Sequence, residues 1–175
     1  PAAGIAAGEQ SPSLSASPIY QAAPGLCHCR YWVIIIKPVS VLSCLPYGVG
    51  HADEGICLQL QIGPYRVMLD CGLQTLELLP VERAASAPVD FVFCTHADPD
   101  HGRSLLELHE TWPDLPIYCS DATADLLPLN WPEVAMPHGA EFCQRVPWRQ
   151  PVELAQGLTA KLWPAGHLPG AACLL

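Results

Sequence analysis

One polar segment constrains the fold of this chain more than any other feature, namely Thr95–Gly102 with the sequence THADPDHG. It follows directly on the apolar run Phe91–Cys94, which predicts a buried strand. Imidazole and carboxylate groups, which are ligands for divalent metals such as zinc, are thereby crowded at a strand end. Polar groups this dense beside an apolar run need a partner that offsets their desolvation, and a cation is the simplest one. We therefore expect a metal site here.

The length and composition favour one compact, loop-rich domain. A chain of 175 residues is long enough to bury a real core. Half of the residues are apolar and 14% are charged, which excludes a wholly disordered protein, while 19 prolines and 13 glycines require many turns. Residues 1–40, rich in Ala, Pro, Ser and Gly, are predicted to be a disordered or non-native leader, and residues 41–175 the folded domain. Because the chain stops inside the strand expected from Ala171, we expect that domain to be incomplete at its carboxyl end.

The charge and hydropathy limit the partners. A net charge of −9 argues against a surface of Lys and Arg that binds nucleic acid, although a bound metal can supply positive charge locally. No apolar run approaches the roughly 20 residues that cross a bilayer, so no membrane partner is expected. The first 29 residues hold no Lys or Arg, so a secretory signal is not expected and a cytoplasmic location is the prediction. The oligomeric state stays open.

Most cysteines and isolated histidines have simpler interpretations than metal binding. The chain has nine cysteines, and those within or at the ends of apolar runs are predicted to be small buried hydrophobes in a reducing compartment. These are Cys57, Cys71, Cys94, Cys119 and Cys173. The one-residue gap in the segment Cys27–Cys29 does not match zinc-binding spacings. His51, His109 and His138 are likewise predicted to be structural.

The remaining pattern alternates strands and helices, which predicts an α/β domain with layers on a sheet. Strands are expected at 41–45, 56–62, 65–69, 89–95 and 116–119, then as a meander at 143–148, 152–155 and 158–163, and helices at 75–86, 103–112 and 120–127. Residues 46–55 and 128–140 are expected to be a turn and a loop. Asp70 ends the strand 65–69, where ligands gather in layered folds, although a turn or capping role is the simpler alternative.

Three motifs in this order resemble the metallo-β-lactamase fold superfamily. They are Asp70-Cys71-Gly72, then residues 95–101 (THADPDH), then residues 165–171 (AGHLPGA). The superfamily has a strand ending in Asp-x-Gly, the core motif His-x-His-x-Asp-His, and a separate later His. The last motif is most similar to the β-CASP group of nucleic-acid processing enzymes. The resemblance covers about residues 41–175, and the combined order is specific where one motif alone would be weak.

The resemblance implies an αββα sandwich, of which the chain holds roughly the first half, with two zinc ions at one sheet edge. His96 and His167 would bind the first ion, Asp100 and His101 the second, and Asp70 would order the loop from behind. A metal-activated water would attack a phosphorus or carbonyl centre, and Asp100 would also orient that water as the catalytic group.

Asp98 departs from the superfamily pattern, because it stands where the second His of the core motif is usual. A carboxylate oxygen also binds zinc, at about 2.0–2.2 Å, so Asp98 is a candidate ligand. Carboxylates suit harder ions, so Mn²⁺ or Fe²⁺ is an alternative to Zn²⁺. The later bridging Asp and final His of the superfamily do not occur before Leu175, so the 175-residue chain alone is expected to bind metal weakly at most and to lack useful activity.

The function that the resemblance implies for the complete protein is metal-dependent hydrolysis, in particular a ribonuclease-type phosphodiesterase of RNA processing. A thioester or lactone hydrolase for a small substrate uses the same chemistry and suits the acidic chain. A degenerate, non-catalytic interaction domain is the alternative that Asp98 and the missing ligands favour. Tight binding of two ions by the complete protein would be incompatible with this last alternative.

Overall fold

The computed structural model describes residues 42–50, 54–79 and 86–175. All of them belong to one unit, Trp32–Leu175. The leader predicted at 1–40, the segment Cys27–Cys29 and His51 lie outside the described residues. None of the helices in the described part is long and apolar enough to cross a membrane.

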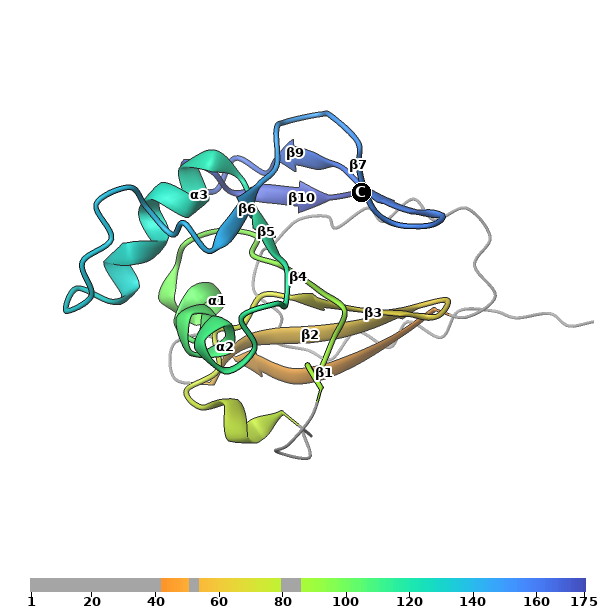
Figure 1. Cartoon of the computed structure of the whole chain (residues 1–175), viewed down its shortest axis with the longest axis horizontal. Helices are drawn as coiled ribbons and strands as arrows, with labels where there is room; N and C mark the ends of the chain where they lie inside the picture. The colour runs from red at the N-terminus through yellow and green to blue at the C-terminus, as the bar shows by residue number, and fades with distance from the viewer. Residues whose placement is uncertain (1–41, 51–53, 80–85) are drawn as a thin grey trace, which may run out of the picture. The chain divides into compact units, whose positions relative to one another are not determined.

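A mixed six-stranded sheet forms the centre of this unit (Figure 1). Its strands, in spatial order, are β1 (Leu42–Gly50), β2 (Gly55–Ile62), β3 (Tyr65–Leu69), β4 (Phe91–Phe93), β5 (Ile117–Cys119) and β6 (Cys143–Arg145). The first three strands pair antiparallel, whereas β3 through β6 pair parallel. Because parallel strands point the same way, the residues that follow β3, β4 and β5 meet at one edge of the sheet.

Short helices connect the parallel strands. They are the 3₁₀ turn η1 (Leu76–Leu78), α1 (Pro99–Gly102), α2 (Leu105–Thr111), α3 (Asp121–Leu126) and the 3₁₀ turn η2 (Leu127–Asn130). Helix α3 begins at its predicted cap, where the Ser120 hydroxyl accepts a hydrogen bond from the Thr123 N–H at 3.2 Å. The predicted helix 103–112 corresponds to α2, which starts after Ser104, and α1 is a separate short helix within the polar motif.

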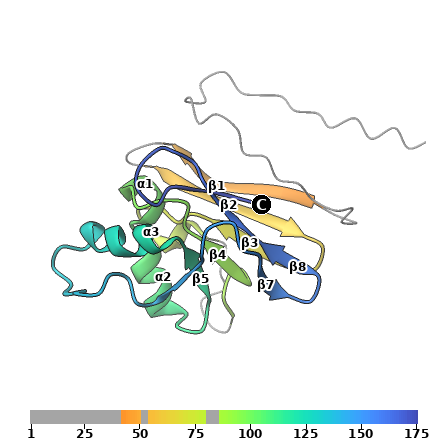
Figure 2. The ribbon, with the colours of Figure 1, turned by 90° about the horizontal axis from the view of Figure 1, so that it is seen from above.

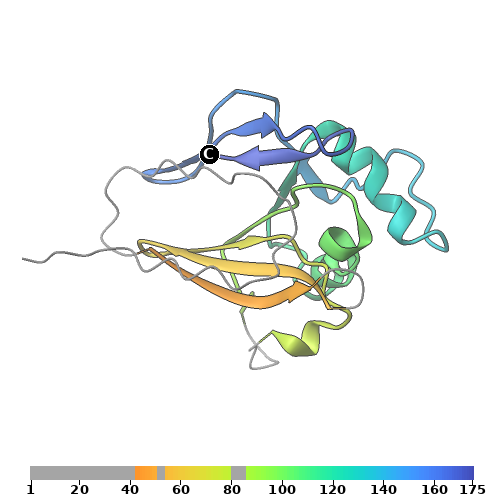
Figure 3. The same cartoon turned by 180° about the vertical axis from the view of Figure 1, so that it is seen from behind.

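Two further antiparallel pairs follow the sheet. Strand β7 (Val152–Ala155) pairs with β8 (Leu158–Ala160), and β9 (Leu162–Pro164) pairs with β10 (Ala172–Leu174). Figure 3 shows the β9–β10 pair (blue) apart from strands β1 to β3 (orange to yellow). The predicted meander of 143–163 is therefore confirmed only for its β7–β8 hairpin. Strand β6 joins the main sheet parallel to β5, and the run 158–163 changes partner at Lys161, whose backbone pairs with Leu175.

Two local predictions also differ from the structure. Strand β1 continues through the predicted turn, because the backbone of residues 48–50 pairs with residues 55–57 of β2. The helix predicted at 75–86 is only the 3₁₀ turn η1 in its described part. The turn ends at Leu79, which has extended backbone, and residues 80–85 lie outside the description.

Both faces of the sheet are covered by apolar side chains. On one face Met68, Val92 and Ile117 belong to a cluster with Leu105 and Leu108 of α2. On the other face Val67, Phe93 and Tyr118 pack with Ala160, Leu162 and Ala172 of the β8–β10 region. Helices thus line one face and the small strand pairs the other (Figure 2). This explains why β4 has no polar side chain, and the mixed α/β layering confirms the predicted fold class.

Candidate metal centre

The centre is built on a buried carboxylate at the end of β3. Asp70 is 2% exposed and has a φ of 60°, a conformation that Asp tolerates better than most residues. Its Oδ1 accepts a hydrogen bond from the Thr95 N–H at 2.6 Å, and its Oδ2 accepts one from the Thr95 hydroxyl at 2.8 Å. His101 Nδ1 also lies 2.8 Å from Oδ2. We call Asp70, Thr95 and His101 the buried network; it ties the end of β3 to the polar motif after β4.

Gly72 explains why this carboxylate lies in an Asp-x-Gly turn. A Cβ at Gly72 would lie 1.8 Å from the Asp100 carbonyl oxygen. The neighbouring Cys71 N–H donates to the His101 carbonyl at 2.9 Å. The turn therefore passes so close beneath α1 that only glycine fits.

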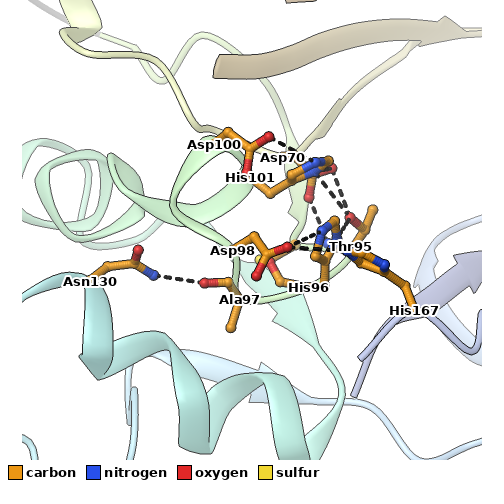
Figure 4. A network of polar contacts seen from close by, with 10 residues as sticks. Asp70, Thr95, His96, Ala97, Asp98, Asp100, His101, Asn130 and His167 are labelled. Carbon is orange, nitrogen blue, oxygen red and sulfur yellow. Dashed lines mark hydrogen bonds and ion pairs between the residues drawn. The ribbon is translucent and has the colours of Figure 1, made fainter. Parts of the chain in front are cut away.

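Asp98 caps helix α1 with its backbone carbonyl, whereas its side-chain carboxylate lies beside two histidines. The Asp98 carbonyl accepts hydrogen bonds from the His101 and Gly102 N–H groups, both at 2.9 Å, and Pro99 occupies the first helical position. The carboxylate makes no capping hydrogen bond. Instead Asp98 Oδ2 lies 3.4 Å from His96 Nε2 and 3.2 Å from His167 Nε2 (Figure 4).

One ligand atom from each of His96, Asp98 and His167 lies within 4.8 Å of the others. We call these residues the acceptor group. The His96 side chain is 10% exposed, whereas those of Asp98 and His167 are 43% and 62% exposed. The group is therefore buried at His96 and open to solvent at Asp98 and His167.

The proton positions follow from the hydrogen bonds. The single hydrogen of the Thr95 hydroxyl goes to Asp70, so Thr95 Oγ1 accepts from His96 Nδ1, 2.9 Å away. We assign the proton of neutral His96 to Nδ1 and the lone pair to Nε2, which faces Asp98. His101 likewise uses Nδ1 toward Asp70, and its Nε2 lies 3.8 Å from Asp100 Oδ2. This is the arrangement in which histidines ligate metals, where one ring nitrogen donates a hydrogen bond to the protein and the other binds the ion.

The two buried histidines have opposite pKa shifts. Burial lowers the pKa of His96 and the neighbouring His101 lowers it further, against the opposing charges of Asp70 and Asp98. Burial also acts to lower the pKa of His101, but its hydrogen bond to Asp70 and the nearby carboxylates outweigh burial and raise that pKa. His96 is therefore kept as the neutral imidazole that binds metals.

The residues present fit a divalent metal ion. Two imidazole nitrogens and a carboxylate oxygen form a donor set that zinc, iron and manganese accept. In the acceptor group His96 Nε2 presents its lone pair to Asp98 Oδ2, whereas His167 Nε2 can either donate a hydrogen bond to that oxygen or, in the other tautomer, join it in binding a cation. Asp100 and His101 form a second pair beside it, since the rings of His96 and His101 lie 3.9 Å apart between centroids. The structure thus brings all the predicted site residues to one edge of the sheet.

Several supporting residues were not identified from the sequence. Asn130 Nδ2 donates to the Ala97 carbonyl at 3.0 Å and so holds the backbone between His96 and Asp98. Trp131 Nε1 donates to the Arg103 carbonyl at 2.8 Å, behind α1. Nothing in the local pattern distinguishes these side chains from ordinary loop residues, because their partners lie far away in the sequence.

The residues predicted to be structural lie outside the acceptor group. His109 stacks on Phe142 with ring centroids 4.8 Å apart, and His138 is exposed. The prediction of buried cysteines is confirmed for most of the set, although Cys173 is only half-buried. The buried ones are Cys57, Cys71, Cys94 and Cys119, to which the structure adds Cys143.

Histidine and carboxylate side chains that could hold a metal ion thus gather at one edge of the sheet of an α/β domain. The protein-family model described as "Beta-lactamase superfamily domain" matches residues 65–172, which is more than half of the chain. The chain therefore belongs to this superfamily, whose fold binds divalent metals and whose members are generally hydrolytic. The resemblance recognised in the three motifs is confirmed.

Curated relatives share this region. The chain is 52% identical over 139 residues to the uncharacterized protein sll0514 of Synechocystis sp., covering 79% of this chain and 24% of that protein. It is 27% identical over 130 residues to an RNase J-like protein of Methanocaldococcus jannaschii, covering 67% and 29%. It is 36% identical over 81 residues to the transcription termination factor FttA of Methanothermobacter thermautotrophicus, covering 42% and 13%. The chain thus spans less than a third of each of these relatives.

Solved structures show the same fold. The metallo-β-lactamase fold protein YhfI of Bacillus subtilis superposes with a TM-score of 0.52 at 18% identity, covering 77% of this chain and 56% of that one. The chemotaxis sensor ODP, solved as a peroxy diiron species, gives a TM-score of 0.52 at 19% identity, with 81% and 58% covered. At such identities the likeness establishes the metallo-β-lactamase fold and nothing finer.

Proposed function

We propose that the protein containing this chain is a metal-dependent phosphodiesterase that cleaves RNA and uses two divalent ions, with zinc as the first candidate. The observation that carries the proposal is the convergence of the ligand atoms of His96, Asp98 and His167 within 4.8 Å. Asp100 and His101 lie beside them at the same edge of the sheet. Similarity to an RNase J-like protein and to a transcription termination factor supports RNA as the substrate.

The acceptor group would hold the first ion, and Asp100 with His101 the second. A bound divalent ion lowers the pKa of a coordinated water and offsets charge that develops on a phosphate. The chain's own contribution is to fix the protons of its histidines. Asp70 and Thr95 keep them on Nδ1 of His101 and His96, so each Nε2 stays available as a ligand. The Asp100 carboxylate would orient the attacking water by accepting its hydrogen bond.

The charge of the chain makes the ions necessary for this substrate. Asp and Glu number 17 against 8 Lys and Arg, so the net charge of this chain repels a phosphodiester backbone. Metal ions would supply the positive charge at the one place where the scissile phosphate must lie. We therefore expect the binding of RNA, and not only its cleavage, to require the ions.

Hydrolysis assays on the longest protein that contains this chain test the proposal. RNA and bis-nitrophenyl phosphate are offered with added Zn²⁺ or Mn²⁺, and metal-stimulated turnover of RNA is expected. His96→Ala should abolish it, whereas His109→Ala, which changes a histidine outside the acceptor group, should not. RNA cleavage that survives both chelation and His96→Ala would contradict the proposal.

Two other results would assign a different function. Tight metal binding with turnover of a thioester or lactone, but of neither phosphodiester, would replace RNA by a small substrate, which the acidic charge favours. Failure to bind any divalent metal would indicate a non-catalytic interaction module, which the carboxylate at Asp98 favours. Calorimetric titration with Zn²⁺ and Mn²⁺ separates these outcomes before any substrate is chosen.

A further inference from the structure

The loop that carries His167 is held at its far end by the first turn of helix α3. This loop, residues 165–171, joins β9 to β10 and is exposed up to His167. The Gly170 carbonyl oxygen lies 2.7 Å from Ser120 Oγ and 3.0 Å from Thr123 Oγ1. Both of these hydroxyl-bearing residues are 0% exposed. Two fully buried side chains thus form hydrogen bonds to the backbone of an exposed loop.

The contact is too close for any residue but glycine on the loop side. Gly170 has a φ of 88°, and a Cβ there would lie 2.5 Å from the Thr123 nitrogen and 2.7 Å from its Oγ1. Gly166, in the same loop, also has a positive φ but has nothing within 4 Å of the equivalent point. Gly166 therefore serves only to turn the chain, whereas Gly170 docks the loop on α3.

The position of His167 depends on the backbone of this loop. The His167 side chain is 62% exposed and reaches Asp98 at 3.2 Å, so little packing restrains its ring. The loop closes on itself through a hydrogen bond from Ala165 N–H to the Ala171 carbonyl at 2.8 Å. It is also joined to the polar motif by the Ala172 N–H, which donates to the Thr95 carbonyl at 2.9 Å. A displacement at Gly170 would consequently be transmitted to His167.

We propose that Ser120 and Thr123 are positioning residues of the metal centre, which hold the Gly170 carbonyl so that His167 Nε2 stays beside Asp98 Oδ2. Ser120 has two roles, because its oxygen also accepts the Thr123 N–H that starts α3. The conformation of the first turn of α3 is thereby coupled to the position of His167 in the acceptor group. The inference rests on the metal site of the proposed function and does not depend on the substrate.

A substitution that preserves shape isolates the hydroxyl. Thr123→Val removes Oγ1 and keeps the bulk, and Thr123→Ser returns the hydroxyl. Thr111→Val is the matched control, because its hydroxyl donates to the Glu107 carbonyl at the exposed end of α2. For the longest protein that contains this chain, titrated with Zn²⁺ by calorimetry, we expect Thr123→Val to weaken binding about 10- to 100-fold. Thr123→Ser and Thr111→Val should bind as the unchanged chain does.

A double-mutant cycle separates positioning from general destabilisation. If Thr123 acts through His167, then Thr123→Val should cause no further loss of affinity in a His167→Ala background. An equal further loss in that background would overturn the inference. Should Thr123→Val fail to fold, Thr123→Ala enters the same cycle.

Hydrogen exchange on the metal-free chain gives a readout that needs no bound ion. Faster exchange of the Ala171 and Ala172 amides is expected in Thr123→Val, with protection restored in Thr123→Ser. Unchanged exchange at these amides would overturn the inference even if Zn²⁺ binds. Conversely, if the longest protein that contains this chain binds no metal while the chain shows the faster exchange, the proposed function is contradicted and the docking of the loop stays supported.

Discussion

The metal centre consists of two groups of similar residues in contrasting surroundings. In the buried network, Asp70 is 2% exposed and accepts hydrogen bonds on both oxygens from Thr95, with His101 on one of them. In the acceptor group, the Asp98 side chain is 43% exposed and faces Nε2 of His96, which carries no proton in the assigned tautomer, and Nε2 of His167. The two carboxylates thus have different roles, because one satisfies buried donors and the other lies open to solvent beside two histidine nitrogens.

This difference indicates that the buried network makes the site rigid, whereas the acceptor group provides the groups that bind a cation. A saturated carboxylate behind the histidines fixes their orientation and contributes to stability without any ligand. An unsaturated set in front gains its partner only when a cation arrives. Substitutions in the two groups should therefore change different measurements, and the largest effects should fall in the buried network.

Asp70→Ala should have the largest effect. It leaves the N–H and hydroxyl of Thr95 and the Nδ1–H of His101 without their buried acceptor, so the free energy of unfolding should fall by about 3–5 kcal/mol. Urea denaturation of the metal-free chain measures it. Asp98→Ala is the matched control and should cost less than about 1 kcal/mol, because that carboxylate is half-exposed and caps nothing. Equal losses for the two variants would erase the distinction between the groups.

His167→Ala should act on binding alone. We expect the affinity for Zn²⁺ to fall by more than about 100-fold, beyond the range typical of residues behind the ligands. The free energy of unfolding of the metal-free chain should stay within about 0.5 kcal/mol, since the side chain is 62% exposed. Calorimetry on the longest protein that contains this chain measures the affinity, and urea denaturation of the metal-free chain measures the stability. His138→Ala, at an exposed histidine elsewhere, should leave both unchanged; a large loss of stability in His167→Ala would argue for a structural role instead.

Thr95→Val should affect both measurements, because Thr95 joins the two groups. Losing the hydroxyl removes a donor to Asp70 and the acceptor that holds His96 Nδ1. Affinity for Zn²⁺ should fall about 10- to 100-fold, and the free energy of unfolding by about 1–3 kcal/mol. Thr95→Ser retains the hydroxyl and should recover most of both. If only one of the two quantities changes, the hydroxyl does not link the groups.

Asn130→Ala should give the smallest effect. Its amide donates to the Ala97 and Leu127 carbonyls in hydrogen bonds that are only partly buried, so the loss should be about 1 kcal/mol of unfolding free energy. Affinity for Zn²⁺ should change by less than tenfold, because the neighbouring residues His96 and Asp98 also restrain the backbone of Ala97. A loss as large as that of Thr95→Val would move Asn130 into the set of residues that define the centre.

The parts of this fold that were predictable are those set by short-range pattern. The alternation in Gly55–Ile62 and the capping serine at 120 were interpreted correctly, because the period of apolar residues and a side chain three positions from its N–H are local properties. The meander was right for the β7–β8 hairpin, but β6 and β9 have other partners, because several partners compete for a short strand. The change of partner at Lys161 depends on Leu175, which no local pattern brings near.

The sequence alone determined the donor chemistry, since the order of Asp70, the 95–102 motif and His167 supplies the imidazole and carboxylate groups and indicates the superfamily. Only the tertiary structure decided which of these groups face one another. Asp98 and His167 are 69 positions apart, and their 3.2 Å contact exists because β10 returns to the end of β4 and α3 holds Gly170. Residue types determine what can bind a cation, whereas long-range packing determines whether the lone pairs converge on one point.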